Sequence, residues 1–328
     1  MKTKEQLYRP FFQYSSFLFS KRNLIGRALL WGGMIVVCTW ACEEEITPIG
    51  SDDPPEIVVE GFIEGGELPT PPVVIITKSI PFSRIVGDGR LSSLFVHDAE
   101  VQVSNGSQTV QLSEFCWDDL EEDQKRSILE NFNLGFDSLA VNVCVYTDPN
   151  INFLGEIGQT YDLEILAEGK RLTAQTTIPP HVPIDSLFFK PNTAPFWELL
   201  GFIEDVDSLA SFYRYFTSIN QAPFISPVTS VSDDLFFNGQ SFEFPLNKAE
   251  RGGSVPIQEY GLYYAGDTVG VKWTTIDEVH FNFWSTLEFN SFNQGPFGSY
   301  TRVESNIDGG LGIWGGYANS YYFIIVPQ

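Results

Sequence analysis

The sequence has few of the residues, and none of the short motifs, that usually mark an enzyme. Its only histidines are His97, His181 and His280, which lie far apart along the 328 residues. The sequence lacks the zinc motif H-E-x-x-H, the phosphate-binding P-loop, the nucleophile motif G-x-S-x-G and the redox motif C-x-x-C. We therefore predict no catalytic residues, no metal site and no cofactor, and we expect a protein that is not an enzyme.

Basic residues are also scarce. The chain has 19 lysines and arginines against 42 aspartates and glutamates, and its formal net charge is −23 at pH 7. A surface of this sign repels the phosphates of nucleic acids and the headgroups of anionic lipids. The composition therefore predicts no nucleic-acid partner, and any attachment to a membrane must rest on something other than charge.

Cysteine is the third scarce residue, with four in the chain. Cys38 lies within the leader described below and Cys42 directly follows it, which leaves Cys116 and Cys144 as an even pair. In an exported protein such a pair predicts a disulfide, whereas two buried free thiols would behave as small hydrophobic residues. Catalysis by either cysteine is the least favoured interpretation, because no histidine lies near them in the sequence.

The N-terminus carries the pattern of an export signal. An apolar run, residues 28–40, follows three basic residues and ends at Ala41, directly before Cys42. A positive region, a short apolar region and a small residue at the cleavage point define a signal peptide. A cysteine at the next position makes residues 1–41 a bacterial lipoprotein signal peptide. Acyl chains such as palmitate on Cys42 would then anchor the protein.

A membrane-spanning helix is the alternative interpretation of this run. The run is about 13 residues long, whereas about 20 are needed to cross the hydrocarbon core. Thr39 and Trp40 depart from the usual lipoprotein motif, which has leucine and a small residue at these positions. If cleavage failed, the segment would stay as an anchor and the topology would barely change.

Residues 42–55 are acidic, then rich in proline, glycine and serine, and predict a flexible acidic tether.

Residues 56–180 predict an N-terminal β-sandwich domain. Runs of β-branched and aromatic residues alternate with turns, and Asn105-Gly106 between two such runs is a strong hairpin signal. Residues 118–132 break the pattern and predict a short surface helix. Together these segments predict an antiparallel sandwich of the immunoglobulin-like or transthyretin-like type. Strands are expected at 57–63, 73–77, 99–104, 109–112, 139–146, 161–165 and 171–177.

Residues 178–183 predict a domain boundary, because they contain three prolines, which a central strand does not accommodate. Residues 181–328 then predict a second β-rich domain with one or two short helices. A capping box at 275–278 predicts a helix over 275–290, although apolar residues at alternate positions from 279 to 289 favour a strand. We expect the helix. Strands are expected at 211–219, 235–237, 241–244, 258–264 and 268–274.

A glycine-rich stretch precedes the strand-like run 321–326. Gly310, Gly312 and Gly315 match the dinucleotide-binding pattern G-x-G-x-x-G, but no helix follows them, so we do not predict nucleotide binding. We expect a tight turn that packs Trp314 and Tyr317 onto the second domain.

Several stretches, together with the leader, resemble the DUF4249 family of Bacteroidota cell-envelope lipoproteins. The similarity covers nearly all of the chain after the leader, and its last motif is the most specific. The stretches are 57–63, 173–179 leading to 184–189, 266–269 and 305–312. The resemblance implies a lipoprotein often found beside TonB-dependent outer-membrane receptors. It implies no established chemistry, so no catalytic residue can be carried over.

The acidic residues Glu43, Glu44 and Glu45 resemble the signal that sends lipoproteins of this lineage to the outer face of the outer membrane. An ordinary solvated linker is the alternative. We expect an outer-membrane lipoprotein, exposed at the cell surface or else on the periplasmic face, that binds a glycan or other nutrient or assists a TonB-dependent receptor. A structural or adhesive envelope module is the second hypothesis, and a glycan hydrolase is the third.

Replacing Cys42 by serine should release the protein from the membrane, because the hydroxyl cannot carry the thioether-linked lipid that the leader predicts. Immunoblotting of membrane and soluble fractions measures the effect. Cys38→Ser is the matched control and should leave the protein in the membrane fraction. A Cys42→Ser protein that stays with the membrane would contradict the lipoprotein assignment.

Overall fold

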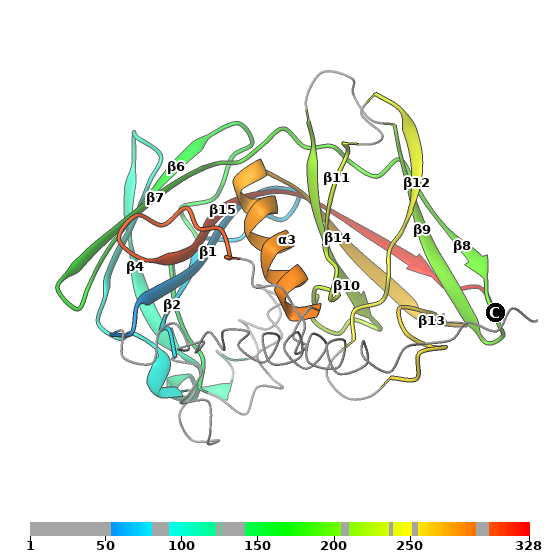
Figure 1. Cartoon of the computed structure of the whole chain (residues 1–328), viewed down its shortest axis with the longest axis horizontal. Helices are drawn as coiled ribbons and strands as arrows, with labels where there is room; N and C mark the ends of the chain where they lie inside the picture. Colours follow the sequence, from blue (N-terminus) through cyan, green and yellow to red (C-terminus); the bar gives the residue numbers. More distant parts are fainter. Residues whose placement is uncertain are drawn as a thin grey trace, which may run out of the picture. The chain divides into compact units, whose positions relative to one another are not determined.

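The computed structural model describes residues 54–80, 92–122, 125, 142–204, 210–235, 239–250, 255–292 and 302–328, all within the compact unit Asp52–Gln328. This unit is mainly β, as predicted (Figure 1). The first strands are β1 (Ile57–Gly66), β2 (Val73–Lys78), β3 (Glu100–Ser104), β4 (Thr109–Cys116), β5 (Cys144–Thr147), β6 (Thr160–Ala167) and β7 (Lys170–Thr177).

The remaining strands are β8 (Ser186–Pro191), β9 (Phe196–Glu204), β10 (Phe212–Ile219), β11 (Val231–Asp233), β12 (Ser241–Pro245), β13 (Tyr263–Tyr264), β14 (Thr268–Ile276) and β15 (Leu311–Ile325). Two short 3-10 helices, η3 (Ser92–Leu94) and η4 (Trp117–Asp119), and the helix α3 (Glu278–Phe292) complete the described elements. In this part of the chain, no helix combines the length and the hydrophobicity that a bilayer-spanning segment requires.

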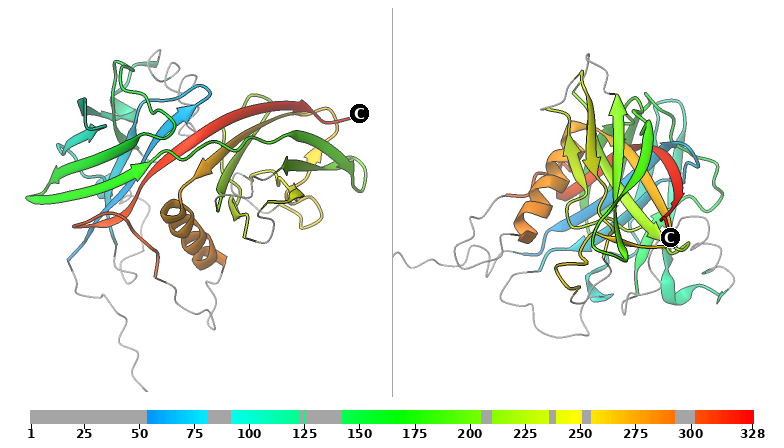
Figure 2. Two further views of the ribbon diagram at one scale, coloured as in Figure 1. Left: turned by 90° about the horizontal axis from the view of Figure 1, so that it is seen from above. Right: turned by 90° about the vertical axis from the view of Figure 1, so that its right-hand side faces the viewer.

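Eleven strands form one continuous sheet in the order β11-β10-β14-β15-β1-β2-β5-β4-β3-β6-β7. A second sheet has the order β12-β9-β13, with β8 paired to β9. The long sheet bends at β4, which pairs with β5 on one side and β3 on the other, so that its N-terminal strands pack in two layers. The result is a sandwich-like arrangement in each half of the unit (Figure 2).

Each half has its own hydrophobic core. The first core is built mainly from β1 to β7 and includes Val59, Val101, Tyr161 and Ile165, all with no exposed surface. The second is built from later strands, around Trp273. β15 contributes to both, through Trp314 and Ala318 in the first and through Tyr322 and Ile324 at the edge of the second. The predicted division at residue 180 stays a prediction.

In the glycine-rich tail, the predicted turn is wrong for residues 311–317. Residues 311–325 form the longest strand, parallel to β1 and antiparallel to β14. Trp314 packs in the first core instead of on the second half, and its indole N–H donates to the carbonyl of Tyr161 at 3.1 Å. Glycine serves here for close approach: a Cβ at Gly315 would lie 2.1 Å from the His280 ring, and one at Gly316 would lie 3.0 Å from Ile178.

The predicted helix is present as α3, and the alternative strand is excluded. Its start differs from the prediction, because β14 continues to Ile276 and occupies the first residues of the proposed capping box. The carboxylate of Asp277 instead accepts the backbone N–H of His280 at 2.7 Å. This bond satisfies a backbone donor that would otherwise lack a partner in the first turn.

The other local predictions had mixed outcomes. Every strand predicted before residue 178 overlaps an observed one, but β8 and β9 were missed because their apolar run does not alternate. The strand predicted at 258–264 is wrong except for β13, because turns occupy 257–261 and Gly261 has a φ of 76°. Residues 236–237 and most of the predicted surface helix at 118–132 lie outside the described residues.

Replacing Trp314 by alanine should destabilise the protein by about 3–5 kcal/mol, because this fully buried indole fills the first core and its N–H is bonded there. The control is Ile325→Ala, on the same strand at a side chain that is 67% exposed, with an expected loss of about 1 kcal/mol or less. Urea unfolding measures both. Equal effects would show that Trp314 is not part of a core.

Candidate functional site

The predicted site residues fall in two groups. Cys42 and the triplet 43–45 lie outside the described residues, so lipidation and the export signal stay predictions. Cys116 and Cys144 form the predicted disulfide, as directly opposed residues of β4 and β5 with Cα atoms 4.0 Å apart. The structure also brings His97 to this pair, with its Nδ1 4.0 Å from the Cys116 sulfur, although 19 residues separate them in the sequence.

A second group of functional side chains lies where α3 covers the long sheet. α3 packs against β10, β11 and β15, on one face of the sheet (Figure 2). Alternate residues of β10, β14, β15 and β1 point to this face, as the contact between Gly315 and the His280 ring shows. We name these side chains, with three from α3, the polar–aromatic cluster: Phe62, Glu64, Arg214, Phe216, Lys272, Tyr317, Tyr321, His280, Trp284 and Glu288.

Arg214 lies at the centre of the part covered by α3. Its side chain is buried, and its guanidinium carbon lies over two aromatic rings, 3.4 Å from the ring centre of Trp284 and 4.8 Å from that of Phe216. The guanidinium donates to the Tyr317 hydroxyl at 2.8 Å and to the Ser230 hydroxyl at 3.2 Å. Contacts with two aromatic rings and charge-assisted hydrogen bonds together stabilise an arginine that has left water.

Lys272 and Glu64 form an ion pair beside this arginine. Only 2% of the Glu64 side chain and 14% of the Lys272 side chain are exposed. The second Glu64 oxygen accepts the hydroxyl of Thr70 at 3.0 Å. The Lys272 ammonium also lies 5.5–5.9 Å from the ring centres of Phe216, Tyr317 and Tyr321. Each charge is therefore compensated within the protein.

Burial shifts the pKa of three members of the cluster, His280, Tyr317 and Glu288. Burial lowers the pKa of His280 well below its ordinary value, and the positive charge of Arg214 adds to this, so the imidazole is neutral at pH 7. Burial raises the pKa of Tyr317 to about 12, although Arg214 opposes the shift. Burial also raises the pKa of Glu288, which accepts the backbone N–H of Ser230 at 3.0 Å.

Three side chains of this region carry buried polar atoms that have no hydrogen-bond partner among the described residues. These atoms are the Nδ1 of His280, the indole nitrogen of Trp284, and the amide nitrogen and oxygen of Asn319. Asn319 lies on β15 between Tyr317 and Tyr321. Buried polar groups are usually bonded to protein or water. The cluster thus offers donors and acceptors next to aromatic rings, and its charges are already paired.

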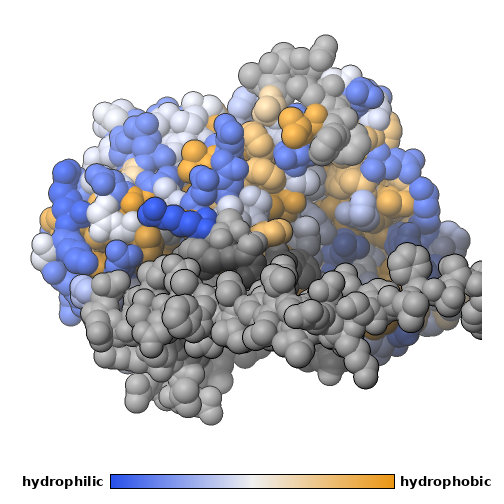
Figure 3. All heavy atoms as spheres, in the orientation of Figure 1, coloured by the Kyte–Doolittle hydropathy of each residue, from blue (hydrophilic) through white to orange (hydrophobic). Residues whose placement is uncertain are grey.

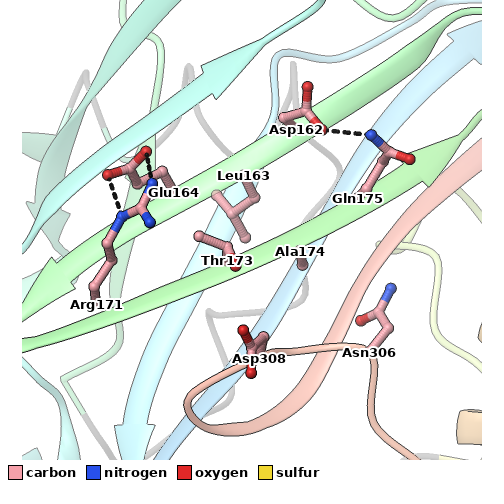
Figure 4. A pocket seen from close by; sticks show the side chains of 9 residues that line it. All are labelled: Asp162, Leu163, Glu164, Arg171, Thr173, Ala174, Gln175, Asn306 and Asp308. Atoms are coloured by element: carbon pink, nitrogen blue, oxygen red, sulfur yellow. Dashed lines mark hydrogen bonds and ion pairs between the residues drawn. The ribbon is translucent and has the colours of Figure 1, made fainter.

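A polar hollow of ≈ 440 Å³ lies on the outer face of β6 and β7 (Figure 4). Arg171 binds both oxygens of Glu164, at 2.8 and 3.0 Å, and the Gln175 amide donates to Asp162 at 2.7 Å. Thr173 and Asp308 exchange two backbone hydrogen bonds. The hollow can hydrogen-bond a polar molecule, but its exposed ion pair contributes little, and its main acidic and basic groups satisfy one another.

The closing motif 305–312 has a structural role in this hollow. The side-chain amide of Asn306 donates to the Trp314 carbonyl at 2.8 Å and its oxygen accepts the Trp314 N–H at 2.9 Å. The glycine at 309 has a φ of 85°, and a Cβ there would lie 2.6 Å from the Arg171 carbonyl. The motif therefore fixes the start of β15 against β7.

Sequence reasoning missed the polar–aromatic cluster. One signal was available: Arg214 and Lys272 are rare basic residues in the middle of predicted strands, where apolar residues dominate. A positive charge at such a position indicates a buried partner. The partner itself, Glu64, is separated from Lys272 by 208 residues, so only the fold could identify it.

Fold and cluster define a mainly β protein with two sandwich-like halves, joined by one strand, and a helix laid over paired buried charges. Comparison with protein families matches residues 43–322 to the domain of unknown function DUF4249, and the chain belongs to this family. No curated protein matches the chain. The resemblance found in the sequence is thereby confirmed.

Replacing Glu64 by glutamine should destabilise the protein by about 3–5 kcal/mol, because Lys272 would be left buried without its carboxylate. Glu243→Gln is the matched control, since it breaks a Lys190–Glu243 pair in which both side chains are 51% exposed, with an expected effect of about 0–1 kcal/mol. Urea unfolding at pH 7 measures both variants. A loss at Glu64 no larger than the control would show that the buried pair is not needed.

Proposed function

We propose that the protein is a lipoprotein anchored in the outer membrane and exposed at the cell surface. In this proposal it binds a nutrient without transforming it and assists a TonB-dependent receptor in uptake. The leader ending before Cys42 supports the anchor, and the acidic triplet 43–45 supports surface exposure. The resemblance to the DUF4249 family of cell-envelope lipoproteins, found in the sequence, implies an envelope role.

The polar–aromatic cluster is the observation that carries the binding role. The rings of Phe62, Phe216 and Tyr321 are only partly buried, and those of Phe216 and Tyr321 lie within 6 Å of the Lys272 ammonium. Aromatic faces next to a few fixed polar groups are typical of small-molecule sites. A glycan suits such a surface, because its apolar ring faces stack on aromatic side chains and its hydroxyls bond to the polar groups.

The charges of the cluster favour binding over catalysis. Arg214 and Lys272 already have partners, and His280 is neutral and enclosed. A general acid or base needs a pKa near the working pH and access to its substrate.

On the face shown in Figure 3, hydrophobic side chains gather mainly over the C-terminal strands, which gives a receptor an apolar surface to contact.

The tether supports assistance to a receptor in the same membrane. Residues 42–55 span at most about 50 Å when fully extended, at about 3.3–3.6 Å per residue. The folded unit therefore stays near the bilayer and near any β-barrel receptor there. Acyl chains hold it, and the acidic surface keeps it off the headgroups.

Tyr321→Ala should weaken glycan binding by about 1–3 kcal/mol, or roughly 5- to 150-fold in the dissociation constant, by removing one stacking face. Titration calorimetry with a panel of soluble polysaccharides measures this on the purified full chain. Tyr264→Ala is the matched control, at an exposed tyrosine on β13 outside the cluster, and should bind as the wild type does.

Crosslinking of intact cells tests the receptor separately, and a β-barrel receptor should co-purify with the lipoprotein. No binding across the panel, together with recovery of the lipoprotein alone, would overturn the proposal. Turnover of a glycan would replace it with the hydrolase hypothesis.

A further inference from the structure

The disulfide has two further potential metal ligands beside it. In the part of the chain that the structure describes, His97, Glu114, Cys116 and Cys144 each place one ligand atom within 4.8 Å of all the others. The Cys116 sulfur lies 3.6 Å from a Glu114 oxygen and 4.0 Å from the His97 Nδ1, and these last two atoms are 2.5 Å apart. One nitrogen, one oxygen and two sulfurs thus converge.

Local structure explains why these residues meet. Glu114 and Cys116 are two positions apart on β4 and so share one face of the strand. Cys144 is directly opposite Cys116 on β5. His97 lies just before β3, in a segment held by Tyr146, whose hydroxyl donates to the Val96 carbonyl at 2.7 Å.

The carboxylate of Glu114 is itself positioned. Its second oxygen accepts the backbone N–H of Asp98 at 3.0 Å, which leaves the first oxygen directed at His97. Bonds of this kind orient the ligands of metal sites. The His97 side chain is 51% exposed and that of Glu114 is 20% exposed, so an ion can reach them from solvent.

The spacing fits a tetrahedral zinc ion. Zinc binds sulfur at about 2.3 Å and nitrogen or oxygen at about 2.0–2.2 Å, so neighbouring ligand atoms lie about 3.3–3.8 Å apart. The separations given above come within about an ångström of that range. The two sulfurs are the exception, because they are bonded to each other and cannot bind the ion as thiolates until that bond is reduced.

We propose that His97, Glu114, Cys116 and Cys144 form a Zn²⁺ site when the disulfide is reduced. A dithiol transfers two electrons and two protons to the Cys116–Cys144 bond, becomes a disulfide itself and leaves two thiols. Zn²⁺ then binds both sulfurs as thiolates and releases two protons. The disulfide and the metal are therefore alternative crosslinks of β4 and β5, and this inference does not depend on the proposed function.

Cobalt spectroscopy tests the site. The full chain carrying Cys38→Ser and Cys42→Ser keeps only Cys116 and Cys144 as cysteines. After reduction with dithiothreitol and removal of the reductant, one Co²⁺ per chain should give a thiolate charge-transfer band and tetrahedral visible bands, which Zn²⁺ abolishes. The oxidised chain should give neither, and Cys144→Ser should lose about half of the charge-transfer intensity.

The other two ligands have their own variants. His97→Gln and Glu114→Gln should each weaken Co²⁺ binding at least about tenfold. Glu100→Gln, at an exposed carboxylate on the neighbouring β3, should not change it. Zn²⁺ should also raise the melting temperature of the reduced chain, and raise that of the reduced Glu114→Gln chain less.

Three results would overturn the proposal. The first is a folded, reduced chain without the charge-transfer band. The second is a band whose affinity is unchanged in both His97→Gln and Glu114→Gln, because the thiols would then bind metal without the site. The third is a reduced chain that circular dichroism shows to be unfolded even with Zn²⁺, because the site requires β4 and β5 to be paired.

Discussion

The pairing of β15 with both β1 and β14 is the constraint on which the rest of the unit depends. One strand of 15 residues runs parallel to β1 over its first part and antiparallel to β14 over its last part. Its two faces are buried against different neighbours, with Trp314 in the first core and Tyr317 beneath α3. In the long sheet, this strand joins β14 of the second half to β1 of the first half.

The same strand explains why charges are buried beneath α3. On β15, Tyr317 accepts a hydrogen bond from Arg214 and lies near the Lys272 ammonium. β1, the parallel partner of β15, supplies Glu64. Isolated charges in such a place would be strongly unfavourable, but each here has an opposite charge, a hydrogen bond or an aromatic face. Paired charges fix one register of the four strands, because a shift by one residue would turn Lys272 and Glu64 to the opposite face.

The disulfide and the cluster lie in different parts of the sheet and serve different ends. The disulfide joins β4 and β5, near the bend where the sheet turns into its second layer. The cluster lies on β10, β14, β15 and β1, where aromatic rings remain partly exposed. A rigid strand framework with polar groups held in place is a suitable scaffold for a binding surface.

The sequence by itself determined the mainly β class, most of the strands, the helix, the disulfide pair and the family, because strand periodicity, turn residues, the capping residue Asp277 and an even cysteine count are local or countable signals. It misjudged residues 311–317, since glycines that allow a tight turn also allow close packing of a strand, and no neighbouring residue distinguishes the two. Only the tertiary structure decided that Lys272 meets Glu64, that Arg214 packs on two aromatic rings and that His97 reaches the disulfide. Apart from Arg214 with Phe216, these contacts join residues 19 to 208 positions apart. Their geometry follows from strand order, which a single sequence does not specify.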